Sequence, residues 1–316
     1  MLDYFKGWPK KKRLTYIAVA VFVAVCLLVE LIGRIPGIPF NGWPDVFRMV
    51  GLSQDYVVPE GELEVHFLDV GNADCILIQQ GEHHMLIDAG EVTDYKYVVD
   101  YLDRHGVTKL DLVLSSHSHA DHIGDMATVL ETYAVDRYLM AFMPEGEEPT
   151  TNLYLSTLEA LDERNVPVDD VKPGDVYALG TARVQIVAPL TDRDDPNNMS
   201  VVARLTFGNR SFLFTGDAEA EVEREILTAG YDVSADVVKA GHHGSNTSSS
   251  AAFVRAVAPE YVVFTCGAKK SYGHPHEETV DRWMDADATC YRSDVHGAVV
   301  FTTDGETLTV STEKGG

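Results

Sequence analysis

Within the stretch SHSHADHIGD, residues 116–125, the six positions 117–122 gather three histidines and an aspartate. It follows the apolar run LDLVLS, which predicts a strand that ends where the histidines begin. His117 and His119 can turn their imidazoles to one side, while Asp121 and His122 can face a second point nearby. Imidazole and carboxylate ligands without thiolate suit zinc, manganese or iron. Two such metals about 3.5–4 Å apart can activate a water and stabilise both oxygens of a displacement.

Two further segments place ligand-type side chains directly after predicted strands. FLFTGD ends in Asp217, a carboxylate at the edge of an apolar strand that is well placed to bridge two metals. A helix-capping aspartate is the alternative, because AEAEVERE follows. VVKAGHHGS places His242 and His243 after another strand. Loops at strand ends commonly carry function, so these positions extend the histidine motif.

Two loops supply candidate substrate contacts. DPNNMS precedes a strand and offers donors to a phosphate or a metal-bound oxygen. KKSYGHPHEE brings His274 into a loop punctuated by glycine and proline, beside two lysines. The residues concerned are Asn197, Asn198, Ser200, Lys269, Lys270 and His274.

Short strands with turn signals, interleaved with helices, must position these loops. Hydrophobic periodicity predicts helices at 94–105, 123–132, 151–165, 219–228, 249–256 and 277–286. Strands are predicted at 110–115, 176–179, 182–188, 200–207, 210–215, 235–240, 261–265, 298–301 and 307–311, with a hairpin near residue 81. Two strand-rich halves of this kind favour a layered α/β fold with the sheets inside.

Eight segments occur in one order over roughly residues 63–310: FLDVGNADCILIQ, LIDAG, SHSHADHIGD, NNMSVV, FLFTGD, VVKAGHHGS, YGHPH and GAVVFTTDG. Together they resemble the metallo-β-lactamase superfamily, and within it the hydrolase domain of ComEC-like competence proteins. The resemblance implies an αββα four-layer sandwich with the metal site at one edge, between the two sheets.

The resemblance also implies a ligand set for two divalent metal ions, zinc or manganese. His117 and His119 would bind one metal, Asp121 and His122 the other, and Asp217 would bridge them. One histidine of the HHGS run would complete the second site. We favour His243 as this ligand, with His242 facing the substrate, and the reverse assignment stays open.

Further roles follow from the same resemblance. Catalytic roles fall to Asp121, His242 and His274, with His274 contacting the transferred group. Asp69 and Asp88 are expected to orient the ligating imidazoles through N–H bonds. Asp74 is either another such residue or a turn cap.

Two departures from the wider superfamily bear on the chemistry. No histidine occurs between His122 and His242, where the β-lactamase and glyoxalase branches place a metal ligand. Asn197 and Asn198 stand there in chain order, as in the ComEC-like and phosphorylcholine esterase branches. This argues against lactam or thioester hydrolysis. Asp125 stands where ComEC-like sequences usually have glycine, close enough to the motif to alter the choice of metal.

The beginning of the chain has a different character. Residues 1–13 form a basic segment, expected to be cytoplasmic, and residues 14–33 are almost entirely apolar. We predict a single transmembrane anchor there, with a cleaved signal peptide or a buried helix as alternatives. Residues 34–61 are a linker rich in proline and glycine, and residues 62–316 are the hydrolase domain, expected outside the cytoplasm.

The chain is strongly acidic, with 49 Asp and Glu against 25 Lys and Arg and a net charge of −24. Such a balance opposes tight, non-specific binding to a polyanion, so metals and a few local cations would have to hold a nucleic acid. The predicted function is a phosphodiesterase using a metal-activated water, acting on DNA as a ComEC-like nuclease. Alternatives are a cell-envelope phosphodiester hydrolase, a non-phosphate ester or thioester hydrolase, and a non-catalytic binding protein. The sequence indicates no protein partner.

Overall fold

The computed structural model describes residues 10–32, 46, 56–268 and 272–315. The chain divides into two compact units, Met1–Tyr56 and Val57–Gly316. Residues 1–9 of the predicted basic segment lie outside the described residues, as do residues 34–45 and 47–55 of the predicted linker. The lysines beside His274, Lys269 and Lys270, lie outside them as well.

The apolar run of the first unit forms helix α1 (Lys10–Ile32). Among the residues that the structure describes, we find no helix that combines the length and the apolar character needed to cross a bilayer. The transmembrane anchor predicted over residues 14–33 is therefore not shown by the described part of the chain.

The second unit contains a large sheet whose strands run in the order β17-β16-β1-β2-β3-β5-β7-β8. A third, two-stranded sheet pairs β4 with β6. The bounds of these strands are β1 (Leu63–Phe67), β2 (Ile76–Gln80), β3 (His83–Ile87), β4 (Lys109–Leu110), β5 (Leu112–Leu114), β6 (Ala134–Val135), β7 (Tyr138–Met140), β8 (Val168–Asp170), β16 (Val299–Thr303) and β17 (Leu308–Thr312).

The other large sheet has seven strands in the order β15-β14-β13-β12-β11-β10-β9. Its bounds are β9 (Val176–Leu179), β10 (Ala182–Ala188), β11 (Val202–Phe207), β12 (Arg210–Phe214), β13 (Val237–Lys239), β14 (Tyr261–Phe264) and β15 (Thr289–Arg292). Strands β12 to β15 run parallel to one another, so their carboxyl ends share one edge of the sheet.

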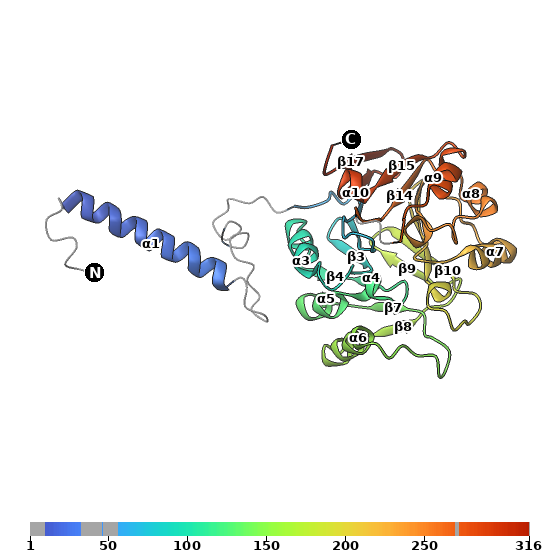
Figure 1. The fold of residues 1–316 in the computed structure, drawn as a ribbon, viewed down its shortest axis with the longest axis horizontal. Coiled ribbons are helices and arrows are strands. Elements are labelled where there is room, and N and C mark those ends of the chain that lie inside the picture. The colour runs from blue at the N-terminus through green and yellow to red at the C-terminus, as the bar shows by residue number, and fades with distance from the viewer. Residues whose placement is uncertain (1–9, 33–45, 47–55, 269–271, 316) are drawn as a thin grey trace. The chain divides into compact units, whose positions relative to one another are not determined.

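Helices cover the outer face of each sheet (Figure 1). On the first sheet lie α3 (Tyr95–Arg104), α4 (Ala120–Ile123), α5 (Met126–Thr132) and α6 (Asn152–Glu163). Beside the second sheet lie α7 (Ala220–Ala229), α8 (Ala251–Val257) and α9 (Glu277–Met284). The chain also forms a short helix, α10 (Ser293–His296), and two 3-10 turns, η2 (Asn197–Met199) and η3 (Gly241–Gly244).

The core between the two sheets is apolar and aromatic. Phe67 of β1 lies against Phe214 of β12, with ring centroids 6.2 Å apart, and Phe301 of β16 lies 6.4 Å from Phe212. All four rings are buried in one cluster that draws on both sheets. Burial on both faces of each sheet produces four layers, so the predicted αββα sandwich is confirmed.

Parallel pairing fixes where the functional loops emerge. In the first sheet β3, β5, β7 and β8 run parallel, and in the second sheet β12, β13 and β14 do so. Asp88 follows β3, the histidine motif follows β5, Asp217 follows β12 and the HHGS run follows β13. All of these loops leave the carboxyl ends of buried strands, where α/β folds place their sites.

Candidate metal centre

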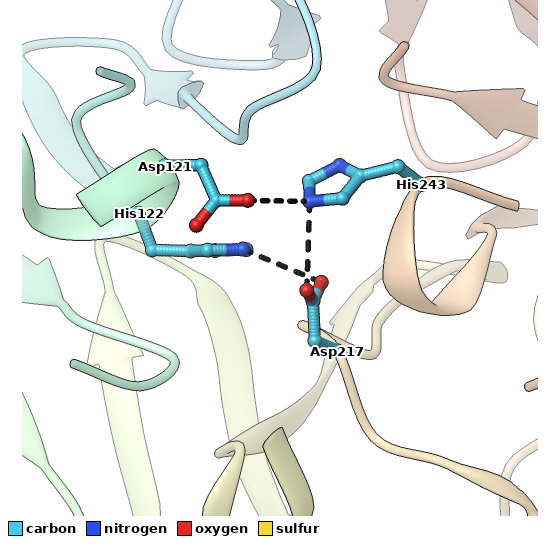
Figure 2. A group of neighbouring side chains, drawn as sticks. All are labelled: Asp121, His122, Asp217 and His243. Atoms are coloured by element: carbon cyan, nitrogen blue, oxygen red, sulfur yellow. Dashed lines mark ion pairs between the residues drawn. The ribbon is translucent and has the colours of Figure 1, made fainter. Parts of the chain in front are cut away.

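Four side chains from three separate segments meet at one point. Asp121 and His122 lie on α4, Asp217 follows β12, and His243 lies in η3 (Figure 2). One ligand atom from each lies within 4.8 Å of the others. Asp217 is central, because its Oδ1 is 3.3 Å from His122 Nε2 and its Oδ2 is 3.5 Å from His243 Nε2. His243 Nε2 is also 3.4 Å from Asp121 Oδ2.

The two buried imidazoles each use one nitrogen to anchor the ring and leave the other unpartnered. His122 Nδ1 lies 2.8 Å from Asp88 Oδ2, and His243 Nδ1 lies 2.9 Å from the carbonyl oxygen of Thr265. The Nε2 atoms of both rings are buried and have no hydrogen-bond partner. Metal-ligating histidines characteristically donate their second N–H to a carboxylate or carbonyl in this way. The donor set therefore fits a metal ion.

The separations within the group also match a shared cation. Two ligand atoms of one tetrahedral zinc, each about 2.05 Å from it, lie about 3.3 Å apart. The contacts of Asp217 with His122 and His243 measure 3.3 and 3.5 Å, and the contact of Asp121 with His243 measures 3.4 Å. The side chains therefore lie at the separations expected for ligands of one shared metal ion.

His117 and His119 form a second pair beside this group. Nε2 of His117 is 3.1 Å from Nδ1 of His119, and the ring of His117 is 4.1 Å from that of His122. Among the described residues, neither belongs to a cluster of three or more acidic, histidine or cysteine ligands. An incomplete protein ligand set is typical of catalytic metals, which keep a position open for water or substrate. The His/Asp cluster as a whole is compatible with two metals.

The charges of the site favour a bound cation. Burial alone would raise the pKa of Asp217, but the charges of His243, His122 and Lys239 outweigh it and hold that pKa well below its usual range. Burial likewise lowers the pKa of His243, yet Asp217 outweighs it and raises the value to about 9. The negative charge of the carboxylates keeps protons on these imidazoles. The same charge would stabilise a metal ion bound in place of those protons.

A buried lysine lies behind the ligands. Lys239, the last residue of β13, is fully buried, and its Nζ is 2.8 Å from Asp74 Oδ2 and 3.4 Å from Asp217 Oδ1. It also donates to the carbonyl oxygen of Gly216 at 2.7 Å. Asp74 in turn accepts from the hydroxyl of Thr265 at 2.5 Å. Lys239 therefore connects Asp217 to the residues that hold His243.

Of the two histidines expected to face the substrate, His242 is more open than the buried ligands, whereas His274 is itself buried. His242 has its side chain 23% exposed, and its Nε2 is 3.6 Å from Asp217 Oδ2. The ring of His274 is 5.5 Å from that of His242, and its buried Nδ1 has no partner. Burial, followed by the charges of His243 and His242, lowers the pKa of His274 to about 4. A neutral imidazole there can donate or accept one hydrogen bond.

Unusual backbone conformations present the two histidines of η3. His242 and His243 have φ values of 49° and 54°, in the left-handed region that side chains seldom occupy. Asp88 shares this feature, with φ 57°. Non-glycine residues in this region cost free energy and cluster at functional sites. Of the seven non-glycine residues with positive φ in the described part of the chain, these three lie at the centre, while Asn165, Ser249, Ala258 and Asp287 lie elsewhere.

Ser200 and Asn198 differ from the predicted substrate contacts. The Ser200 side chain is sealed from solvent, and its Oγ accepts the backbone N–H of Asp217 at 3.0 Å. The Asn198 amide donates to Asp195 at 2.8 Å and accepts from the N–H of Glu219. Both residues brace the loops that hold Asp217. Asn197, next to them in η2, has a buried amide oxygen without a partner.

Asp69 is not at the site, contrary to the prediction that it orients an imidazole. Its carboxylate accepts from Lys314 Nζ at 2.6 Å, near the end of the chain. Asp88 fills the predicted role, since it accepts from His122 and also from the N–H and hydroxyl of Ser116, both at 2.7 Å. The sequence alone does not distinguish these aspartates, because both follow apolar strands.

Three residues that support the candidate centre were not predicted from the sequence. Thr265 acts largely through its backbone carbonyl, which no residue pattern reveals, and Ser116 is a common residue type. Lys239 had a detectable signal, since a lysine inside the apolar run VVKA is unusual.

Asp125, which stands where ComEC-like sequences usually have glycine, is buried at the start of α5, and one of its carboxylate oxygens has no hydrogen-bond partner. Burial, together with the charge of Asp94, raises its pKa to about 7.

Residues 68–267 match the sequence model of the metallo-β-lactamase superfamily, and the chain belongs to that superfamily. The match begins at the end of β1 and runs to the loop after β14, so it includes every residue of the candidate centre except His274.

Within the superfamily the chain is similar to competence proteins. It is 28% identical over 269 residues to ComE operon protein 3 of Bacillus subtilis, covering 78% of this chain and 34% of that protein. It is 29% identical over 285 residues to competence protein ComA of Neisseria gonorrhoeae, covering 88% and 38%. The chain thus spans little more than a third of these relatives.

Solved structures share the fold at low sequence identity. CmlA, a diiron β-hydroxylase from Streptomyces venezuelae, superposes with a TM-score of 0.51 at 17% identity, over 86% of this chain and 61% of that one. The metallo-β-lactamase fold protein YhfI from Bacillus subtilis gives 0.50 at 12% identity, over 77% and 99%.

Proposed function

We propose that this chain is a metal-dependent phosphodiesterase whose substrate is DNA. The observation that carries the proposal is the group formed by Asp121, His122, Asp217 and His243, with two unpartnered Nε2 atoms directed at one carboxylate. The similarity to competence proteins supports DNA as the substrate. Zinc and manganese both suit a ligand set of imidazole and carboxylate.

When bound, two divalent ions lower the pKa of a water and neutralise charge on the phosphoryl oxygens. The chain holds this arrangement rigidly. Asp88 keeps the proton of His122 on Nδ1, so Nε2 offers its lone pair to the centre. The carbonyl of Thr265 does the same for His243. Ser200 and Lys239 fix the backbone and the carboxylate of Asp217 between the two rings.

His274 and His242 are proposed to act on the substrate itself. The two rings lie 5.5 Å apart, beside His243 and Asp217. The unpartnered Nδ1 of His274 can donate to a phosphoryl oxygen, where hydrogen bonds to developing charge stabilise a transition state. His242 lies between Asp217 and Glu219, at 3.6 Å from each carboxylate, which suits a group that passes a proton to the leaving oxygen.

The decisive experiment uses the full chain, freed of metal and reloaded separately with manganese and zinc. Hydrolysis of bis-p-nitrophenyl phosphate and of single-stranded DNA is followed for the wild type, His119→Ala and Asp217→Asn. We expect cleavage of both substrates by the wild type and a loss of at least 100-fold in each variant. The matched controls are His83→Ala and Asp192→Asn, which change exposed residues outside the centre.

The outcomes separate the candidate functions. Turnover that persists in both His119→Ala and Asp217→Asn contradicts the site assignment. Cleavage of the small diester without DNA points to an envelope phosphodiester. A thioester is assayed beside these substrates, and faster hydrolysis of the thioester than of either phosphodiester points to the other hydrolase branches. Failure to bind metal, measured by elemental analysis of the reloaded protein, favours a non-catalytic role.

A further inference from the structure

The loop that carries His274 ends at His276, the residue directly before α9. The ring of His274 lies 5.5 Å from that of His242 and 6.3 Å from that of His243. Its buried Nδ1 makes no hydrogen bond that could fix the ring at the centre. The position of this ring therefore depends on packing and on the contacts that hold the loop.

Three hydrogen bonds among the described residues connect the loop and the start of α9 to residues 244–246. The backbone N–H of His276 donates to the carbonyl of Gly244 at 3.0 Å, and that of Asn246 donates to His276 Nδ1 at 3.0 Å. The hydroxyl of Thr279 donates to the carbonyl of Ser245 at 3.2 Å. His276 thus takes part in two of the three bonds, once through its backbone and once through its ring.

The side chain of His276 is turned away from its own helix. It occupies the position that caps α9, where serine or aspartate accepts an N–H of the helix, but its ring makes no such bond. Nδ1 instead faces Asn246, and Nε2 faces Gly273 of the loop, where a Cβ would lie 3.6 Å from it. The ring therefore lies between the two segments that it joins.

Packing couples the position of His276 to that of His274. Their rings lie 5.1 Å apart at 77°, edge to face. Gly244, which follows the ligand His243, has φ +87°, and a Cβ there would lie 2.6 Å from that of Pro275. Contacts this close leave the loop little freedom to shift without moving its neighbours.

The bond between Asn246 and His276 defines the chemistry that the position requires. A backbone N–H can only donate, so Nδ1 of His276 carries no proton and the ring keeps its proton on Nε2. An acceptor two bonds beyond Cβ meets this requirement. The side-chain oxygen of asparagine lies at that distance, whereas the oxygen of glutamine lies one bond further out and that of serine one bond closer.

We propose that His276 is a positioning residue, which fastens the loop to η3 and thereby holds the His274 ring at the centre. The inference rests on the proposed function, in which His274 donates to a phosphoryl oxygen. Misplacing such a group by about 1 Å can cost on the order of 100-fold in rate. His276 acts on the substrate only through His274.

The kinetic test follows hydrolysis of bis-p-nitrophenyl phosphate by the manganese-loaded full chain. His276→Gln and His276→Ser should lower kcat about tenfold or more and change KM less than about twofold, because the displaced donor acts on developing charge. His276→Asn, which keeps an acceptor at the place of Nδ1, should retain at least about half of kcat. Since serine is a good helix cap, a loss in His276→Ser does not come from capping.

Coupling to His274 distinguishes positioning from a general structural effect. In a His274→Ala background, His276→Gln should lower kcat less than about twofold further, because its effect acts through the ring that is already missing. Competition with a coloured chelator should give the same metal affinity for the wild type and all His276 variants. The proposal is overturned by additive losses in the double variant, by equal losses in His276→Asn and His276→Gln, or by a metal affinity that falls with kcat.

Two structural measurements test the inference even if no diester is hydrolysed. In proton–nitrogen NMR spectra of the zinc-loaded full chain, His276 should carry its proton on Nε2 and none on Nδ1. In crystal structures, the His274 ring should stay within about 0.5 Å of its wild-type position in His276→Asn and move by about 1 Å or more in His276→Gln. A proton on Nδ1 of His276, or a His274 ring that does not move in His276→Gln, refutes the inference whatever the activity.

Discussion

Lys239 Nζ lies 2.8 Å from Asp74 Oδ2, and both side chains are buried. Asp74 is far from Lys239 in the chain, and the pair joins the loop after β1 to the end of β13. Breaking a buried ion pair leaves one uncompensated charge, whose cost exceeds the net contribution of the intact pair.

We therefore expect Lys239→Met to lower the free energy of unfolding by about 3–5 kcal/mol. The double variant Lys239→Met with Asp74→Asn should recover part of that loss, because it removes both charges. Urea denaturation followed by circular dichroism measures each value. If the double variant is as unstable as the sum of the two single variants, the pair is not coupled.

Asp88 and Asp69 make a matched comparison at the metal centre. Asp88 holds the Nδ1 proton of His122, so Asp88→Asn should weaken metal binding about 10- to 100-fold while the domain stays folded. Asp69 pairs with Lys314, so Asp69→Asn should leave metal affinity unchanged. Competition with a coloured chelator gives both affinities. Equal weakening of metal binding in the two variants would indicate that Asp69 also supports the metal ligands.

Gly216 precedes the central carboxylate and leaves no room for a side chain. Its φ is +51°, and a Cβ would lie 2.8 Å from that of Ser116 and 3.0 Å from Ser200 Oγ. Gly216→Ala should displace Asp217, lower the free energy of unfolding by more than about 2 kcal/mol and abolish hydrolysis.

Gly230, which ends α7, is the control for Gly216. Its φ is +78°, but a Cβ there would meet nothing within 4 Å. Gly230→Ala should therefore cost only the backbone strain, about 1 kcal/mol, with activity retained. If the two variants lose similar amounts of unfolding free energy, backbone strain alone, without crowding at the site, explains the effect of Gly216→Ala.

His105 should make stability depend on pH through a position remote from the metal ligands. Burial, followed by the charge of His66, lowers its pKa from 6.5 to about 4, and its ring stacks on Tyr101 at 4.1 Å. Because the unfolded chain binds the proton more tightly, this stability is complete above pH 6.5 and is lost as the pH falls towards 4.

The expected loss between pH 6.5 and 4.5 is on the order of 1–2 kcal/mol, reduced for the partial exposure of the ring. His105→Phe, which keeps an aromatic ring on Tyr101, should flatten the pH profile of the free energy of unfolding over this interval. His83→Gln, at an exposed position, should leave the profile unchanged. If the slope of the pH profile is unaltered in His105→Phe, the pH dependence of stability arises from other groups.

Secondary structure followed from sequence wherever periodicity was long enough to detect. The predicted strands at 176–179 and 182–188 coincide with β9 and β10, and the helix predicted at 94–105 appears as α3. By contrast β7, β8 and β15 were not predicted. Each has only three or four residues and is defined by parallel pairing with distant strands rather than by its own pattern.

The sequence by itself determined the ligand types and the strand ends where they lie. Histidines and aspartates after apolar runs limit the chemistry to imidazole and carboxylate ligands, and eight ordered motifs identify the fold. Local patterns suffice for this because ligand chemistry and strand propensity belong to individual residues and their near neighbours.

Only the tertiary structure decided which groups meet. It selected Asp88 over Asp69, placed Lys239 against Asp74 and Asp217, and turned Ser200 inward. These contacts join residues far apart in the chain, and their distances depend on sheet register and on packing between layers. No local sequence pattern encodes those distances, because the interaction that creates each one involves side chains from several strands at once.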